Sequence, residues 1–120
     1  MHELSIAESV VRVASRHAAG RSVTKVTVKV GHLRQVVPSA LEFAFELVAE
    51  GTVVAGAELE LEEVAAAGIC RGCEVESELE AFPLQCRRCG ELDMEVTRGE
   101  ELLVDSLELE EEEALTTRGV

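Results

Sequence analysis

Four cysteines in two closely spaced pairs are the feature that most limits how this chain can fold. Cys70 and Cys73 form one Cys-x-x-Cys pair, Cys86 and Cys89 form the other, and the chain has no further cysteine. Two residues between thiolates let one tight turn direct both sulfurs at a single tetrahedral ion. The pattern therefore predicts a four-sulfur metal site made by two such turns, which are separated by twelve residues.

Zinc is the ion that this pattern favours. A closed four-thiolate zinc site has no open coordination position and no redox chemistry, so we expect it to stabilise a small module. Iron in a rubredoxin-like site is the alternative. Rubredoxin-like carriers usually surround their metal with aromatic side chains, whereas Phe82 is the only aromatic residue between positions 67 and 98.

Length and charge restrict the class of protein. The 120 residues suit one small domain with an inserted module. No apolar run approaches the ~20 residues of a membrane helix, and the start lacks the basic region and apolar stretch of a signal peptide. We therefore expect a cytoplasmic protein, in which paired cysteines bind metal instead of forming disulfides. A net charge of −13 disfavours nucleic-acid binding, which needs clustered Lys and Arg.

Hydropathy patterns predict an α+β fold, with two helices on one face of a three-stranded sheet. The helices are expected at 4–19 and from Pro38 to Gly51, where apolar residues recur at helical spacing. Ser5 and Glu8 suggest a capping box at the first helix start, with a start one turn earlier, at His2 or Glu3, as the alternative, and Gly20 suggests its C-terminal cap. Alternating segments predict strands at 23–30, 57–64 and 101–110.

The zinc-ribbon module is inserted before the last strand, so we expect the domain around it to be discontinuous. That domain comprises residues 1–66 plus 99–110, the zinc-binding module 67–98, and a disordered acidic tail 111–120. The strands on either side of the module can run antiparallel, which would place the module at the end of a hairpin. The last strand changes phase near Asp105 and Ser106, so a bulge is expected there.

The N-terminus offers a second set of metal donors. The α-amine of Met1, the amide nitrogen of His2 and its imidazole lie on one continuous chain and can close two chelate rings. The amide nitrogen or the carboxylate of Glu3 would complete a plane, and square-planar nitrogen and oxygen donors suit Ni²⁺ or Cu²⁺ better than Zn²⁺. The alternative is an ordinary helix start, where the helix dipole favours Glu3.

No set of residues predicts an enzyme. The chain has no Gly-rich phosphate loop and no nucleophile beside a plausible base, and its cysteines are all assigned to metal. His17 and His32 are single histidines, which are usually solvated. Two other classes remain open besides a metal carrier: a zinc-ribbon interaction module without transferable metal, and an electron carrier with iron in the four-sulfur site.

Taken in order, these segments resemble the HypA/HybF family of hydrogenase maturation nickel metallochaperones. The resemblance covers about residues 1–110, and both cysteine pairs match the family's zinc knuckles in spacing and order. The segments that carry it are the opening Met1-His2-Glu3-Leu4-Ser5-Ile6-Ala7, then 30–33, 37–38, 43–46, 50–52 and 56–59, and the last strand 101–108.

The resemblance implies a specific activity. It implies Ni²⁺ bound at the N-terminus by His2 and neighbouring backbone nitrogens, with Glu3 assisting, and a structural Zn²⁺ on the four cysteines. It implies delivery of nickel to the large subunit of a [NiFe] hydrogenase together with a maturation GTPase, and in some organisms a supply to urease maturation proteins. We further expect a monomer or weak homodimer, in which the last strand could be exchanged between subunits.

Overall fold

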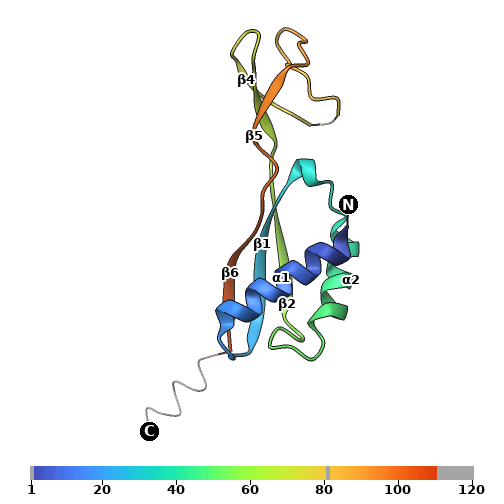
Figure 1. Ribbon diagram of the computed structural model, residues 1–120, viewed down its shortest axis with the longest axis vertical. Helices are drawn as coiled ribbons and strands as arrows, with labels where there is room; N and C mark the ends of the chain where they lie inside the picture. Colours follow the sequence, from blue (N-terminus) through green and yellow to red (C-terminus); the bar gives the residue numbers. More distant parts are fainter. Residues whose placement is uncertain (1, 81, 111–120) are drawn as a thin grey trace. The chain divides into compact units, whose positions relative to one another are not determined.

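The computed structural model describes residues 2–80 and 82–110 (Figure 1). Met1, expected as a nickel donor, and the tail 111–120, expected to be disordered, lie outside the described residues. The expected α+β class is confirmed, with two helices and two three-stranded sheets. The elements are α1 (Glu3–Ala18), β1 (Val23–Gly31), the short 3-10 helix η1 (His32–Arg34), α2 (Pro38–Ala49), β2 (Glu58–Val64), β3 (Ala67–Cys70), β4 (Glu76–Glu78), β5 (Met94–Arg98) and β6 (Leu102–Leu109).

Helix α1 is an amphipathic helix that begins earlier than its capping signal suggested. His2 is the N-cap residue and makes no side-chain cap hydrogen bond, so the expected capping box of Ser5 and Glu8 is wrong. Glu3 occupies the first turn, where its negative charge suits the helix dipole. At the other end the left-handed cap conformation is taken by Ala19 (φ 52°) and continued by Gly20 (φ 87°).

Strands β1 and β2 run parallel and are connected through α2. Lys25 and Thr27 both reach Glu60, and Lys29 reaches Glu62, so the two strands advance together. Parallel neighbours need a crossover connection, which α2 supplies. Pro38 is well suited to the first turn of α2, since its missing N–H would have no acceptor there.

The two faces of β1 differ in chemistry. Val26, Val28 and Val30 are buried, whereas the lysines that alternate with them form ion pairs with β2 on the opposite face. A strand places successive side chains on opposite faces, so the valine face is the one that the helices cover. Leu41 and Phe45 of α2 are among the largest fully buried side chains of this core.

Strand β6 pairs with β1 and not with β2. The sheet order is β2-β1-β6, so β1 lies between the strands that lead into and out of the module. Ser22 and Thr24 contact residues 110 and 108, and this descending register makes β6 antiparallel to β1. The expected hairpin of β2 and β6 is therefore wrong. The expected phase change is present, because Asp105 and Ser106 are consecutive exposed residues within otherwise alternating burial.

The cysteine segment builds an antiparallel sheet of its own, in the order β4-β3-β5. Ile69 of β3 lies opposite Glu76 of β4 on one side and opposite Glu95 of β5 on the other. A register shift lies between Ala67 and Gly68, where β3 begins to pair with β5. Strand β3 ends at Cys70, so it leads the chain directly into the first cysteine turn.

The chain divides into two compact units. Among the described residues, the first contains 2–28, 36–61 and 103–110, and the second contains 29–35, 62–80 and 82–102. In the second unit a Cβ atom on Gly31 would collide with the backbone of Gly99, so this crossing requires glycine. Hydrogen bonds reinforce it, since the amide of Gly31 donates to the Glu101 carbonyl at 2.7 Å and that of Leu33 donates to the Gly99 carbonyl at 2.8 Å.

Candidate metal centres

The four cysteine sulfurs converge on one point at the end of the module. Their Sγ atoms all lie within 4.8 Å of one another. The distance from Cys70 Sγ to Cys89 Sγ is 3.6 Å, and that from Cys73 Sγ to Cys86 Sγ is 3.7 Å. Sulfurs about 2.3 Å from a tetrahedral ion would stand about 3.8 Å apart, so the cluster fits a four-coordinate ion.

The two cysteine turns have the same construction. In each, the first cysteine sulfur accepts the backbone N–H groups of the second and third residues after it, at 3.3 and 3.4 Å for Cys70 and at 3.4 and 3.5 Å for Cys86. The residue after each pair has a left-handed backbone, with φ 63° at Glu74 and 80° at Gly90. Its amide donates back to the carbonyl of the first cysteine, at 2.7 and 3.0 Å.

The thiols are poised to lose protons unequally. Hydrogen bonds from the amides of Cys89 and Arg88 lower the pKa of Cys86 to about 6. The amide of Glu91 lowers the pKa of Cys89, but the hydrogen bond with Cys70 and burial outweigh it and raise that pKa to about 12. A divalent cation is needed to hold all four as thiolates, since their mutual repulsion otherwise favours retained protons. Arg71, the residue after Cys70, pairs with Asp93 at 2.7 Å.

His2 and Glu3, two of the expected nickel donors, lie at the start of α1. His2 is exposed, and its carbonyl accepts the amide of Ile6 at 3.1 Å as the first helical hydrogen bond. The Glu3 carboxylate accepts the amide of Val37 at 3.0 Å, and this contact is the main reason why the pKa of Glu3 is lowered. Glu3 therefore attaches the start of α1 to the start of α2.

His32 has a role that its sequence context did not indicate. Its Nδ1 lies 3.2 Å from a carboxylate oxygen of Glu63, and its Nε2 lies 2.7 Å from the carbonyl oxygen of Glu80. The Glu80 carbonyl and then Glu63 raise the pKa of His32, because an imidazolium can donate to both and a neutral ring to only one. The one sequence signal was its position directly after the glycine that ends β1.

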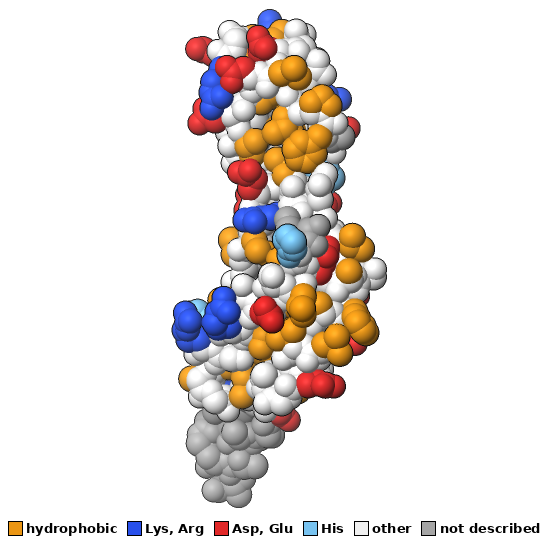
Figure 2. Space-filling model, turned by 45° about the vertical axis from the view of Figure 1, so that its right-hand side comes forward, with side chains coloured by type: hydrophobic (Ala, Val, Ile, Leu, Met, Phe, Trp, Pro, Cys, Tyr) orange, Lys and Arg blue, Asp and Glu red, His pale blue; other side chains and the backbone are white. Residues whose placement is uncertain are grey.

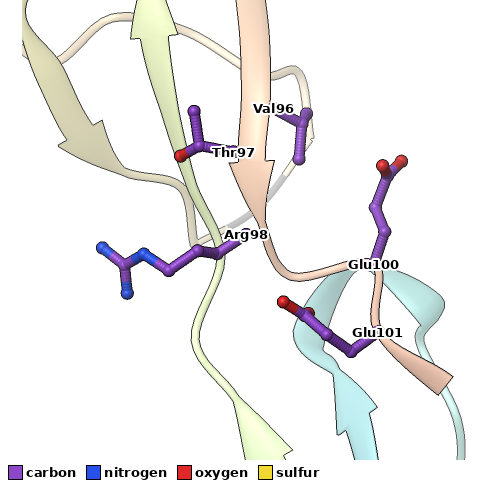
Figure 3. Close-up of a pocket in the computed structure, with 5 residues that line it drawn as sticks. All are labelled: Val96, Thr97, Arg98, Glu100 and Glu101. Carbon is purple, nitrogen blue, oxygen red and sulfur yellow. The ribbon is translucent and has the colours of Figure 1, made fainter. Parts of the chain in front are cut away.

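A cavity of about 270 Å³ beside β5 is lined by five residues (Figure 3). Arg98 points away from Glu100 and Glu101 in this view and pairs with Glu76 at 3.9 Å. Thr97 donates to Glu76 as well, and Glu101 accepts the amide of Gly99. Arg98, Thr97 and Glu101 thus have partners within the second unit, and these side chains do not converge on a shared point.

Fold and sites together define a class: a small α+β protein with a four-cysteine metal module inserted into it. Residues 1–109 match the family model described as "Hydrogenase/urease nickel incorporation, metallochaperone, hypA". The chain therefore belongs to the HypA family of nickel metallochaperones for hydrogenase maturation, as its sequence resemblance predicted.

Relatives and solved structures agree with this assignment. The chain is 46% identical over 110 residues to the hydrogenase maturation factor HypA of Geobacter sp. (strain M21), covering 92% of this chain and all of that one. It is 35% identical over 111 residues to HypA of Trichodesmium erythraeum, covering 92% of this chain and 97% of that one. The solution structure of the nickel metallochaperone HypA from Helicobacter pylori superposes with a TM-score of 0.68 at 25% identity, covering 91% and 97% of the two chains. Among the described residues, no helix has the length and apolarity to cross a membrane.

Proposed function

We propose that this protein binds Ni²⁺ at its N-terminus and delivers it to the large subunit of a [NiFe] hydrogenase. The donors are the α-amine of Met1, the amide nitrogen and imidazole of His2, and Glu3. The observation that carries the proposal is the exposure of His2 at the N-cap of α1, within the segment 1–109 that the family model matches. Donors on an exposed chain end can be replaced one at a time by an acceptor, which suits transfer.

Glu3 can contribute in either of two ways. Its carboxylate accepts the amide of Val37 through one oxygen and can present the other oxygen to nickel, whereas its backbone nitrogen can coordinate without using the carboxylate at all. Both modes can keep the start of α1 attached to α2 during loading. Square-planar nitrogen donors also suit Ni²⁺.

The cysteine cluster is proposed to hold a structural Zn²⁺ that does not take part in delivery. Support comes from its closed set of four sulfurs, which leaves no coordination position for an acceptor. We assign residues 67–98 to this zinc-binding domain and 1–66 plus 99–110 to the nickel-binding domain. The protein is proposed to act in the cytoplasm as a non-catalytic carrier, a monomer or weak homodimer. Its partners are a hydrogenase maturation GTPase and, in some cells, urease maturation proteins.

A calorimetric Ni²⁺ titration of the zinc-loaded, untagged protein tests the proposal. The native chain should bind one nickel tightly, whereas His2→Ala and a variant with two residues added before Met1 should each lose at least a hundredfold in affinity. His17→Ala is the matched control, because His17 is an exposed histidine on the same helix. Equal affinity of the native and extended chains would reject the terminal chelate and leave a zinc-ribbon interaction protein as the function.

A further inference from the structure

Helix α2 exposes large apolar side chains that a small monomer would normally bury. Phe43 is 64% exposed and Leu47 is 53% exposed, and their spacing of four residues places them on one row of the helix. Val37, which precedes α2, and Leu4, which follows the Glu3 anchor, are also more than half exposed. Figure 2 shows hydrophobic side chains gathered at the surface on the part of the molecule that holds α2. A contiguous apolar surface of this kind usually marks an interaction site.

A second row on the same helix is acidic. Glu42 and Glu46 are exposed and also four residues apart, and Glu50 continues the row at the C-cap. Within residues 2–80 and 82–110, none of the three forms an ion pair. The surrounding segment adds to this negative charge, because glutamates are the only charged residues between Arg34 and Arg71.

The surface beside the acidic row is hollowed. A cavity of about 300 Å³ lies there, lined by Glu42, Phe45 and Glu46 of α2 and by Ala57, Glu58 and Leu59. Its floor is partly apolar and three of its six lining residues are glutamates, so it can accept the aliphatic stem and the charged end of a Lys or Arg side chain.

We propose that the outer face of α2 is a docking surface for a partner helix that presents a row of apolar side chains beside a row of Lys or Arg. The apolar row of that helix would cover Phe43 and Leu47, and its basic row would lie against Glu42 and Glu46. Both rows on α2 follow the four-residue spacing of a helix surface, so an amphipathic helix matches them in register. The four residues that carry the contact, Phe43, Leu47, Glu42 and Glu46, are not proposed nickel donors, and the contact requires no metal.

A second copy of this chain is a poorer occupant than a basic partner. Pairing two α2 helices through Phe43 and Leu47 would place an acidic row of each copy beside the same seam, and each chain carries a net charge of −13. Like charges at such a contact oppose association, whereas a basic partner gains from them.

The test uses a fluorescein-labelled 18-residue helical peptide of leucine and lysine, with one apolar face bordered by lysines. Its affinity for the zinc-loaded full chain is measured by fluorescence anisotropy at 0.15 M salt. The double variants Phe43→Ser/Leu47→Ser and Glu42→Gln/Glu46→Gln should each bind at least tenfold more weakly. Leu103→Ser is the matched control, since Leu103 is a 45% exposed leucine on β6, and it should stay within twofold of the native chain.

Each outcome decides the proposal. Loss of binding in both double variants, with helix content by circular dichroism unchanged, supports it. Equal binding by all variants would mean that the peptide recognises overall negative charge, and absence of binding to the native chain would reject the surface. Concentration-dependent dimerisation that Phe43→Ser/Leu47→Ser abolishes would assign the face to a second copy and also reject the proposal. Nickel titration of the same samples reports separately on the metal function proposed above.

Discussion

Gly90 closes the second cysteine turn with a left-handed backbone, and its replacement by alanine should weaken zinc binding. The φ angle there is 80°, and an added Cβ would meet nothing closer than Gln85 Nε2 at 3.6 Å, so the substitution adds strain without a collision. An L-residue in this conformation costs about 1–2 kcal/mol, of which about 0.5 kcal/mol is offset by the reduced freedom of the unfolded chain. A net cost near ~1 kcal/mol corresponds to about fivefold in an equilibrium constant.

The backbone strain of Gly90→Ala should appear as weaker zinc affinity, because metal binding and folding of the module are coupled. The assay is competition for Zn²⁺ against a chromophoric chelator, in reducing buffer and without oxygen. Gly90→Ala should bind about fivefold more weakly. Glu74→Gly is the matched comparison at the equivalent position of the first turn, where φ is 63°, and it should bind equally or a few-fold more tightly. Affinities of both variants within twofold of the native value, or a weaker Glu74→Gly, would refute the assignment of strain to these positions.

Three further predictions concern the cysteine site and the hydrogen-bonded side chains of Glu3 and His32. Cys73→Ser should release zinc and unfold the module with a smaller effect on the first unit, as measured by metal analysis and amide NMR spectra; a full equivalent of retained zinc would contradict the four-cysteine site. Because the pKa of Glu3 is lowered on folding, its stabilisation is present above the ordinary carboxyl pKa and is lost as the pH falls through the folded value. Glu3→Gln should therefore flatten the acid limb of a urea-unfolding profile measured between pH 3 and 6, and an unchanged limb would remove this role for Glu3. Because the pKa of His32 is raised, its stabilisation is complete below the ordinary histidine pKa and is lost as the pH rises through the folded value. Its NMR titration midpoint should lie above 6.5, the value for histidine in model peptides, and should fall part of the way in Glu63→Gln, since the Glu80 carbonyl remains; a midpoint at or below 6.5 would exclude the two-acceptor arrangement.

Local patterns predicted the elements well because each depends on short-range geometry. The alternation of Val26, Val28 and Val30 with lysines requires a strand with one buried face, and the structure places it so. Pro38 and the apolar residues that follow it likewise located α2 within a residue or two. The start of α1 was harder to predict from the sequence. Ser5 and Glu8 match a capping box, but the helix begins at Glu3, so both residues lie inside it.

The cysteine site was the most predictable part of the function. The sequence spacing within each pair is short enough that one turn determines where both sulfurs point, and the structure brings all four within 4.8 Å. The hydrogen bonds that complete the site could not be inferred from spacing. They depend on left-handed backbones at Glu74 and Gly90, and only the glycine signals that conformation in the sequence.

The sequence by itself determined the helices, the alternating strands and the four-cysteine motif, because these features arise from side chains a few residues apart. Only the tertiary structure decided that β1 lies between β2 and β6, because strand order depends on which long-range pairing the α2 crossover allows. It also decided that Glu3 meets the amide of Val37 and that His32 meets Glu63 and the Glu80 carbonyl. Those partners are more than thirty residues away along the chain, and no local pattern could have indicated them.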